Sequence, residues 1–469
     1  MPVTRVKTFR DPDPKLIRDY MEKALPLIAS KTPNKPGPIH ISNSFLCHAI
    51  GDGSLKSELP IWLKGNDYLD DFVNVEPEGI QRETDHLRRF LQVLFDSDGN
   101  VYKDFSSPFP LSSHFVSRDA SDNGYSRGLW MSLGDQNRVE IATVLSDLLE
   151  DSPGNDGVSN VLASLVKAST KPTLRSSPVS GSTQFGENIG QILIHGLKRG
   201  VGKPVHFRIE LMRQFSILLS SFVVIGMLYD SCKRLPSVSE SSQPSDILGT
   251  FCFTGNTAGR SITEKQLSNL AKLSLRDTLE RAYSGIEETF FSMYKEKRDL
   301  NKKSWSQFAL ELATDHLVLG SATKMANVLN GFGETGIQEV IPSLYPKSHL
   351  RSAVKSLGYK AGMVWPNKSG EPRIVLDSSF VTSLVAFMGE IDMSVDDFSE
   401  IIYKKIGLVF GYQGISSESL SKLEEISGSR VDIPSLLVES QKHLSLRLVS
   451  AGLARQYSDG TAALIGSSI

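Results

Sequence analysis

Basic side chains crowd one short stretch in the middle of the chain, and cations gathered on one surface can bind phosphates or acidic proteins. If residues 197–203 form a loop between two helices, several of these cations would face the same region of solvent. Glu210 is the only acid within the stretch. A plain solvated face is the alternative interpretation, since runs of charge often lie on one. The basic residues are His195, Lys198, Arg199, Lys203, His206, Arg208 and Arg213.

Three further cations near the C-terminus extend this set of candidate contacts. We expect the whole set to meet a partner protein or nucleic acid through exposed positive charge. The candidate partner-binding or nucleic-acid-binding residues are Lys198, Arg199, Lys203, Arg208, Arg213, Lys442, Arg447 and Arg455.

A glycine-rich segment inside the basic stretch invites comparison with phosphate-binding loops. The Walker pattern has two glycines separated by four residues, followed by Lys and then Ser or Thr. Gly202 and Lys203 fit the end of that pattern, but Leu197 stands where the first glycine belongs. Pro204 replaces the hydroxyl residue that would hold the metal ion. The segment therefore predicts a basic loop between two helices, not a nucleotide site.

Carboxylate and histidine patterns that could hold a metal are incomplete. Asp67, Asp70 and Asp71 form an acidic cluster, but no histidine accompanies them. His206 and Glu210 lie one helical turn apart, yet the H-E-x-x-H motif of zinc proteases is absent. The G-x-S-x-G elbow of serine hydrolases does not occur either. We expect no catalytic residue, no metal ligand and no cofactor, which favours a protein that is not an enzyme.

The cysteines give no sign of a metal site or a disulfide framework. Cys47, Cys232 and Cys252 stand far apart, and no C-x-x-C pair is present. Zinc knuckles and ribbons need such pairs. The sequence therefore predicts small buried thiols in a reducing compartment.

Nothing near the N-terminus has the form of a signal peptide. The first 14 residues contain three prolines and no apolar run. The most apolar run, residues 215–229, falls short of the roughly 20 residues that a membrane-spanning helix needs. Serines also interrupt it. We expect a buried core helix in a cytoplasmic protein that does not contact a membrane.

Length and charge suggest three units. The chain has 469 residues, and domains typically take about 100–200 residues each. The net charge of −2 hides a segregation: residues 1–170 carry −6, residues 171–380 carry +8 and residues 381–469 carry −4. The basic middle could bind an acidic partner or nucleic acid. It could equally pack against the acidic ends of its own chain.

Helical spacing of apolar residues predicts a mainly α, multi-domain helical protein with small β elements. The N-terminal unit is expected to be mostly helical with irregular loops. In the middle unit we expect a break in the third helix near Ser284 and Gly285, a turn between helices at 251–259 and a short strand at 373–376. The helices expected there are 186–197, 207–229, 262–294 and 304–329.

The last 80 residues carry the clearest pattern. Helices are predicted over 395–405, 416–426 and 434–451, the first two capped by Ser394 and Ser416. Gly452 follows the third helix in the position of a C-terminal glycine.

Two short strands then flank a tight turn. Residues 453–457 and 461–465 alternate around a Ser-Asp-Gly sequence, which predicts a hairpin. We expect this hairpin and the third helix to share one core that contains Leu444, Leu448, Leu453 and Leu464.

Three helices followed by a hairpin resemble a winged-helix domain. The string LRLVSAGLARQYSDGTAALI is similar to the end of such a domain: a recognition-type helix, a basic strand, an Asp-Gly wing tip and a returning strand. The resemblance covers about 75 residues and implies a module that reads DNA or docks a protein. Its basic residues are few, namely Lys442, His443, Arg447 and Arg455. Because phosphate contacts need Lys and Arg, this composition favours protein docking.

We therefore expect a non-enzymatic adaptor or assembly subunit of a multi-component bacterial nucleic-acid-processing or phage-defence system. The overall sequence pattern of the chain resembles that of accessory proteins of phage-defence operons. Protein partners in a complex are expected, with nucleic acid as a second class of partner. Two alternatives remain open: a DNA-binding protein that uses the basic middle and the winged helix, and a diverged enzyme with no recognisable motif.

Overall fold

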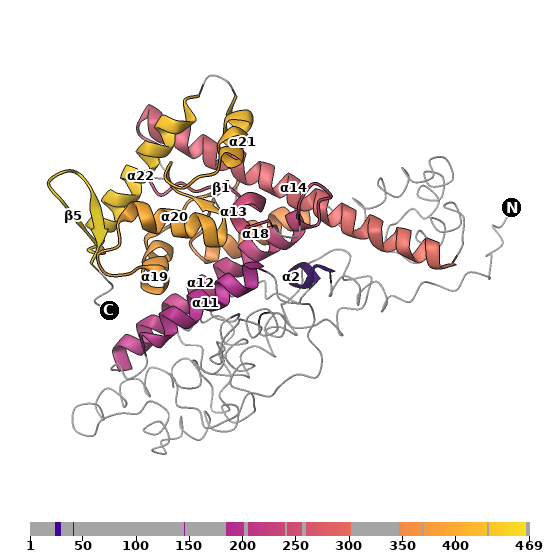
Figure 1. Cartoon of the computed structure of the whole chain (residues 1–469), viewed down its shortest axis with the longest axis horizontal. Coiled ribbons are helices and arrows are strands. Elements are labelled where there is room, and N and C mark those ends of the chain that lie inside the picture. Colours follow the sequence, from indigo (N-terminus) through magenta and orange to yellow (C-terminus); the bar gives the residue numbers. More distant parts are fainter. Residues whose placement is uncertain are drawn as a thin grey trace, which may run out of the picture.

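A computed structural model of the chain describes residues 24–29, 41, 145, 184–200, 205–239, 242–255, 259–301, 347–366, 370–428 and 431–465. The described part is mainly helical with a few two- and three-residue strands, as the sequence predicts (Figure 1). The helices are α2 (Pro26–Ala29), α11 (Gln184–Lys198), α12 (Val205–Lys233), α13 (Pro244–Ile247), α14 (Ile262–Asn301), α18 (Lys347–Lys360), α19 (Ser378–Met388), α20 (Val395–Ile406), α21 (Ser417–Ser427) and α22 (Ile433–Ser450). The strands are β1 (Thr250–Phe251), β2 (Val364–Trp365), β3 (Arg373–Ile374), β4 (Leu408–Val409), β5 (Ala454–Gln456) and β6 (Ala462–Leu464).

Helix α12 lies at the centre of the fold. Its segment Arg213–Lys233 is the one described helix long and apolar enough to cross a membrane, but 94% of its most apolar window is buried within the protein. It packs against α2, α11, α13, α14, α18 and α19. A helix that is apolar on all sides must be covered on all sides. The prediction that residues 215–229 form a buried core helix is confirmed.

Helix α14 runs without a break, so the predicted interruption near Ser284 and Gly285 is wrong. A Cβ at Gly285 would lie 1.7 Å from the carbonyl oxygen of Ser231 on α12. The glycine therefore allows the two helix backbones to approach closely. Glycine in a helix interior costs about 1 kcal/mol relative to alanine, and packing against α12 offsets that cost here.

Residues 251–259 differ from the predicted turn between helices, because their first part is a strand. Strand β1 pairs in parallel with β4, and Phe253 forms a bridge to Val375. The Thr250 amide donates to the Gly407 carbonyl at 3.0 Å and the Cys252 amide donates to the Val409 carbonyl at 2.9 Å. The partners are far away in sequence, so no local hairpin pattern marks the strand.

The predicted strand at 373–376 is confirmed as β3, which pairs antiparallel with β2. Asp377, three residues after the end of β3, is the N-cap of α19, and its side chain accepts a hydrogen bond from the Phe380 amide. This N-cap satisfies one of the free amides at the helix start. Three residues thus separate the strand from the helix, and the last of them, Asp377, caps the helix.

The C-terminal elements follow the predicted order. Ser394 and Ser416 cap α20 and α21, each accepting a hydrogen bond from the amide three residues later. Gly452 ends α22 with a φ of 70°, a left-handed conformation that favours glycine. Strands β5 and β6 form the expected antiparallel hairpin, and Leu444, Leu448, Leu453 and Leu464 are all buried in one core.

That core is shared across the predicted boundary at residues 380/381. Phe215 of α12 and Leu464 of β6 belong to the same hydrophobic cluster. The division into three domains stays a prediction. The predicted helices within residues 1–170, apart from the short described segments, and the helix at 304–329 lie outside the described residues.

Truncating a core leucine of α22 should destabilise the protein far more than truncating its exposed neighbour. Leu448 is fully buried, whereas 56% of the Leu446 surface is exposed on the same helix. Leu448→Ala should cost about 2–5 kcal/mol because it removes buried methyl groups and leaves a cavity. Leu446→Ala is the matched control and should change the free energy of unfolding little. Urea unfolding of both variants is the measurement, and equal losses would contradict the assignment of the two faces.

The buried carboxyl of Asp230 on α12 should make stability depend on pH. Burial raises its pKa to about 7, although Lys233 and Arg234 act in the opposite direction. The folded state therefore keeps a proton that the unfolded state releases near pH 3.9. This group contributes its full stability below that pH, and the contribution is lost as pH rises through about 7.

Asp230→Asn should remove that loss, since the amide stays neutral at all pH values. The variant should gain stability over the wild type between about pH 4 and pH 7, by at most about 4 kcal/mol at about 1.4 kcal/mol per pKa unit. Urea unfolding at pH 5 and pH 8 measures the difference. Parallel pH profiles for the two proteins would refute the assignment.

Candidate interaction surface

Helix α22 has a buried face and an apolar exposed face. Leu437, Leu444 and Leu448 enter the core, whereas Val438 and Leu446 have 46% and 56% of their surface exposed. The two exposed side chains are eight residues apart, about two helical turns, so they lie on the same side of the helix. An apolar stripe is thus left on the surface of a helix whose other side already packs into the core.

A groove runs along this exposed face. Its volume is about 690 Å³, and we call it the α22 groove. Four parts of the chain form it: the start of α20, the loop after β4, α22 and the β5–β6 hairpin, which lie together at one end of the described fold (Figure 1). The groove is lined by Ser394, Asp396, Tyr412, Gln413, Val438, Gln441, Lys442, Ser445, Leu446, Val449, Gln456, Asp459, Gly460, Thr461 and Ala462.

The hairpin wall of the groove is held by backbone hydrogen bonds. The Leu464 amide donates to the Met393 carbonyl at 2.8 Å, and the Asp392 amide donates to the Leu464 carbonyl at 2.8 Å. These bonds attach β6 to the segment that precedes α20. Ser394 continues the pairing with an antiparallel bridge to Ala463. The hairpin wall of the groove is therefore bonded to the segment that leads into α20.

The hairpin turn is closed by one carboxylate. Asp459 Oδ1 accepts hydrogen bonds from the Thr461 amide at 2.9 Å and from the Thr461 hydroxyl at 2.7 Å. These bonds lower the pKa of Asp459. Gly460 between them has a φ of 87°. The tip of the hairpin therefore carries a fixed negative charge beside the groove.

Negative charge dominates the rim of the α22 groove. Asp396 and Asp459 line it, and Glu439 stands next to it on α22. Among the described residues that line the groove, Lys442 is the one cation, and its Nζ lies 3.1 Å from Glu439 Oε2. A phosphate entering the groove would meet more carboxylates than ammonium groups. The groove thus fits an apolar ligand with basic flanks.

Arg447, a predicted contact residue, is engaged inside the fold. Its guanidinium donates to the Leu376 carbonyl at 2.7 Å, to the Thr254 carbonyl and to Ser378 Oγ at 3.3 Å. Burial lowers its pKa, an effect that the Asp377 carboxylate opposes. Arg447 therefore joins α22 to β3 and to the start of α19.

Arg199 is also engaged inside the fold, which corrects the prediction that it forms part of an exposed positive surface. Its guanidinium donates to the Ala386 carbonyl at 2.8 Å and to the Gly389 carbonyl, both at the end of α19. Helix C-termini leave carbonyls unsatisfied and attract cations. Burial and the Arg199 charge lower the pKa of His195, whose Nε2 lies 3.0 Å from Arg199 Nη2.

The other described contact residues of the predicted set lie on different elements. Arg213 pairs with Glu210 on its own helix at 2.6 Å. Lys198 is exposed at the end of α11, and Arg455 is exposed on β5. Lys203 and the side chain of Arg208 lie outside the described residues.

The residues that form the exposed apolar stripe were missed by the sequence reading. Leu446 falls on the helix face opposite Leu444 and Leu448, and Val438 falls on the flank between the two faces. Apolar residues outside the core-facing side of a helix signal a second contact surface. That signal was present in the sequence of residues 433–450. Tyr412, in the loop after β4, had no local pattern that could place it beside α22.

Within the described residues no group of three His, Cys, Asp or Glu side chains is placed to hold a metal ion. Burial raises the pKa of Cys232 to about 11, so its thiol stays protonated near neutral pH. Cys252 is buried too, and burial raises its pKa as well. Neither thiol is therefore suited to act as a nucleophile.

The chain matches no protein-family model, and no significant similarity to a curated protein or to a solved structure is found. The geometry of the described residues is therefore the basis for a functional proposal. The resemblance of the C-terminal elements to winged-helix domains stays a prediction. In this structure β4, between the first two helices of the module, pairs with β1 and not with the hairpin.

Removing Arg447 should destabilise the fold, because the buried carbonyls of Thr254 and Leu376 would lose a charged donor. Arg447→Ala should cost about 1–3 kcal/mol. Arg455→Ala removes an exposed arginine of the same module and should change stability little. Thermal and urea unfolding of the two variants give the comparison. If Arg447→Ala proved as stable as Arg455→Ala, the internal role would be wrong.

Proposed function

We propose that this chain is a non-enzymatic adaptor whose α22 groove docks an amphipathic helix of a partner protein. The observation that carries the proposal is the exposed apolar stripe of Val438 and Leu446, set in a groove with an acidic rim. Contiguous apolar surface rimmed by polar groups is typical of protein interaction sites. Helix-in-groove binding buries an apolar helix face in this kind of groove.

The charges around the groove support a protein partner over DNA. DNA affinity comes mainly from Lys and Arg contacts to phosphates. Arg447 is engaged with carbonyls inside the fold, and Lys442 is paired with Glu439. Asp396 and Asp459 would repel a phosphate backbone. A DNA-binding protein that uses this face is therefore the second candidate, and the exposed Arg455 is the observation in its favour.

The same charges describe the partner helix. Its docking face should carry apolar residues at spacings of three and four, which can contact Val438, Leu446 and Val449. Lys or Arg should flank that face and complement Asp396 and Asp459. The groove volume of about 690 Å³ falls in the range of ligand-binding clefts.

The wider setting we propose is a multi-component nucleic-acid-processing or phage-defence system in which this chain is an assembly subunit. The support for that setting is the resemblance of residues near the C-terminus to winged-helix domains and of the chain to accessory proteins. The docking proposal does not depend on it.

A charged side chain in the apolar stripe should abolish docking of the partner helix without unfolding the protein. Leu446→Asp puts a charge at the centre of the groove, where contact residues can each contribute about 2 kcal/mol or more. The tagged full-length chain is recovered from its native host together with its partner. The affinity for that partner should fall roughly 30-fold or more, since about 1.4 kcal/mol corresponds to a tenfold change. Melting temperature should stay near that of the wild type, because Leu446 is exposed.

Ile262→Asp is the matched control, since Ile262 is 77% exposed at the start of α14 and does not line the groove. It should retain the partner in full. Nuclease treatment before recovery separates the two candidates. A partner that survives Leu446→Asp, or one that nuclease releases from the wild type, would rule out protein docking at this groove.

A further inference from the structure

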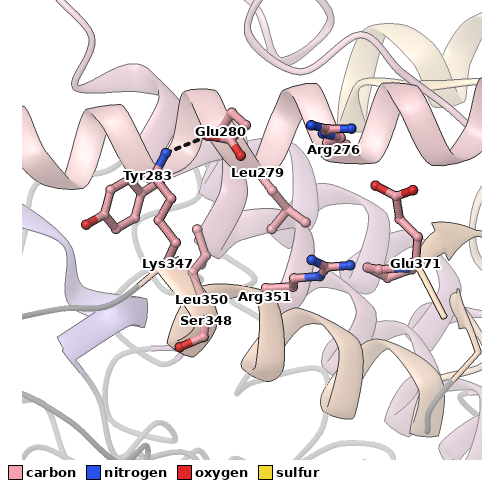
Figure 2. A pocket seen from close by; sticks show the side chains of 10 residues that line it. Arg276, Leu279, Glu280, Tyr283, Lys347, Ser348, Leu350, Arg351 and Glu371 are labelled. Atoms are coloured by element: carbon pink, nitrogen blue, oxygen red, sulfur yellow. Dashed lines mark hydrogen bonds and ion pairs between the residues drawn. The ribbon is translucent and has the colours of Figure 1, made fainter. Parts of the chain in front are cut away.

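A second cavity lies between α14 and α18, separate from the α22 groove. Its volume is about 470 Å³, and the segment just before β3 closes one side. Figure 2 shows two ends separated by the apolar side chains of Leu279 and Leu350. One end holds Tyr283 and Lys347, and the other holds Arg276, Arg351 and Glu371.

The first end is internally neutralised. Lys347 Nζ lies 2.7 Å from Glu280 Oε2 and 5.0 Å from the centre of the Tyr283 ring. Ammonium groups bind both carboxylates and aromatic faces. Lys347 thus has two protein partners, and this end of the cavity needs no ligand charge.

The second end has excess positive charge. Arg276 comes from α14 and Arg351 from α18, and both are exposed to the cavity or to solvent. Within the described part of the chain neither guanidinium has a hydrogen bond, and no carboxylate oxygen lies within 4.0 Å of either. Glu371 lines the same end, where Figure 2 shows all three side chains. Two helices that pack together here thus place two unpaired guanidiniums in one cavity.

Guanidinium groups recognise oxyanions through paired N–H donors. The volume is in the range for a small-molecule site. The leucines offer an apolar surface for a ring, and the Glu371 carboxylate can accept a hydrogen bond from a hydroxyl.

We propose that this cavity binds a small organic phosphate monoester of the nucleoside or sugar phosphate class. Arg276 and Arg351 hold the phosphate, Leu279 and Leu350 contact the body of the ligand, and Glu371 accepts a hydrogen bond from a ligand hydroxyl. This site is independent of the α22 groove, so partner docking and ligand binding can fail separately.

Calorimetric titration of the full chain tests the proposal with adenosine monophosphate, ribose 5-phosphate, adenosine and inorganic phosphate as probes. The two monoesters should bind, adenosine should not, and inorganic phosphate should bind more weakly than either monoester. Arg351→Gln and Arg276→Gln should each weaken monoester binding at least tenfold, about 1.4 kcal/mol. Arg455→Gln, an exposed arginine outside the cavity, should leave binding unchanged.

The Glu371→Gln variant distinguishes a ligand-binding site from a surface cluster of charges that binds no ligand. In the proposed site it removes repulsion, so inorganic phosphate should bind more tightly and the preference for ribose 5-phosphate over inorganic phosphate should narrow. Equal binding of adenosine and its monophosphate, or full binding by both arginine variants, would overturn the proposal. So would an absence of binding by both monoesters. A short DNA with a terminal 5′-phosphate that binds more tightly than the mononucleotide would overturn the assignment to a free small ligand.

Discussion

The fold depends on covering one helix. Helix α12 is apolar around its whole circumference, and its buried residues include Phe215, Leu219 and Tyr229. Six other described elements pack against it. Each fully buried large apolar side chain contributes roughly 1.5–3 kcal/mol, so leaving any side of α12 open would be costly. The close contact at Gly285 and the position of α19 both follow from this requirement.

Helix α19 shows how that requirement reaches the C-terminal elements. It covers α12, and each of its ends is bonded to an arginine from another part of the chain. Arg199, directly after α11, donates to carbonyls at the end of α19. Arg447 of α22 donates to the Leu376 carbonyl and to Ser378 Oγ at the start of α19. A third arginine, Arg281 of α14, donates to the Leu248 carbonyl after α13 at 3.0 Å. Cations that could have contacted phosphates instead hold helices in place.

Arginines that bond to carbonyls within the fold are not free to bind a partner, and this limits which surfaces can bind one. With Arg447 engaged, the exposed face of α22 presents Val438 and Leu446 beside an acidic rim, which supports protein docking. Two guanidiniums that have no hydrogen bond to the described residues, those of Arg276 and Arg351, line the cavity between α14 and α18 instead. The overall charge of a segment thus says little about binding until the partners of each side chain are known.

Local signals explain what could be predicted from the sequence. Ser394, Ser416 and Gly452 mark helix ends through bonds or dihedral angles within a few residues, and those ends were predicted to within about two residues. The pairing of β1 with β4 depends on residues far apart in the chain. So do the bonds of Arg199 to Ala386 and Arg447 to Thr254, which join residues 187 and 193 positions apart. No periodicity or motif encodes such contacts.

The central claim is that the α22 groove docks a helix of a partner protein, and site-specific crosslinking tests it most directly. A photo-crosslinking residue replaces Leu446 in one full-length protein and Ile262 in another, and each is irradiated in the native host. The account predicts one protein adduct at position 446 and none of that product at position 262. The linked peptide should have apolar residues at spacings of three and four with Lys or Arg beside them. Crosslinks to nucleic acid at position 446, or the same products from both positions, would contradict it.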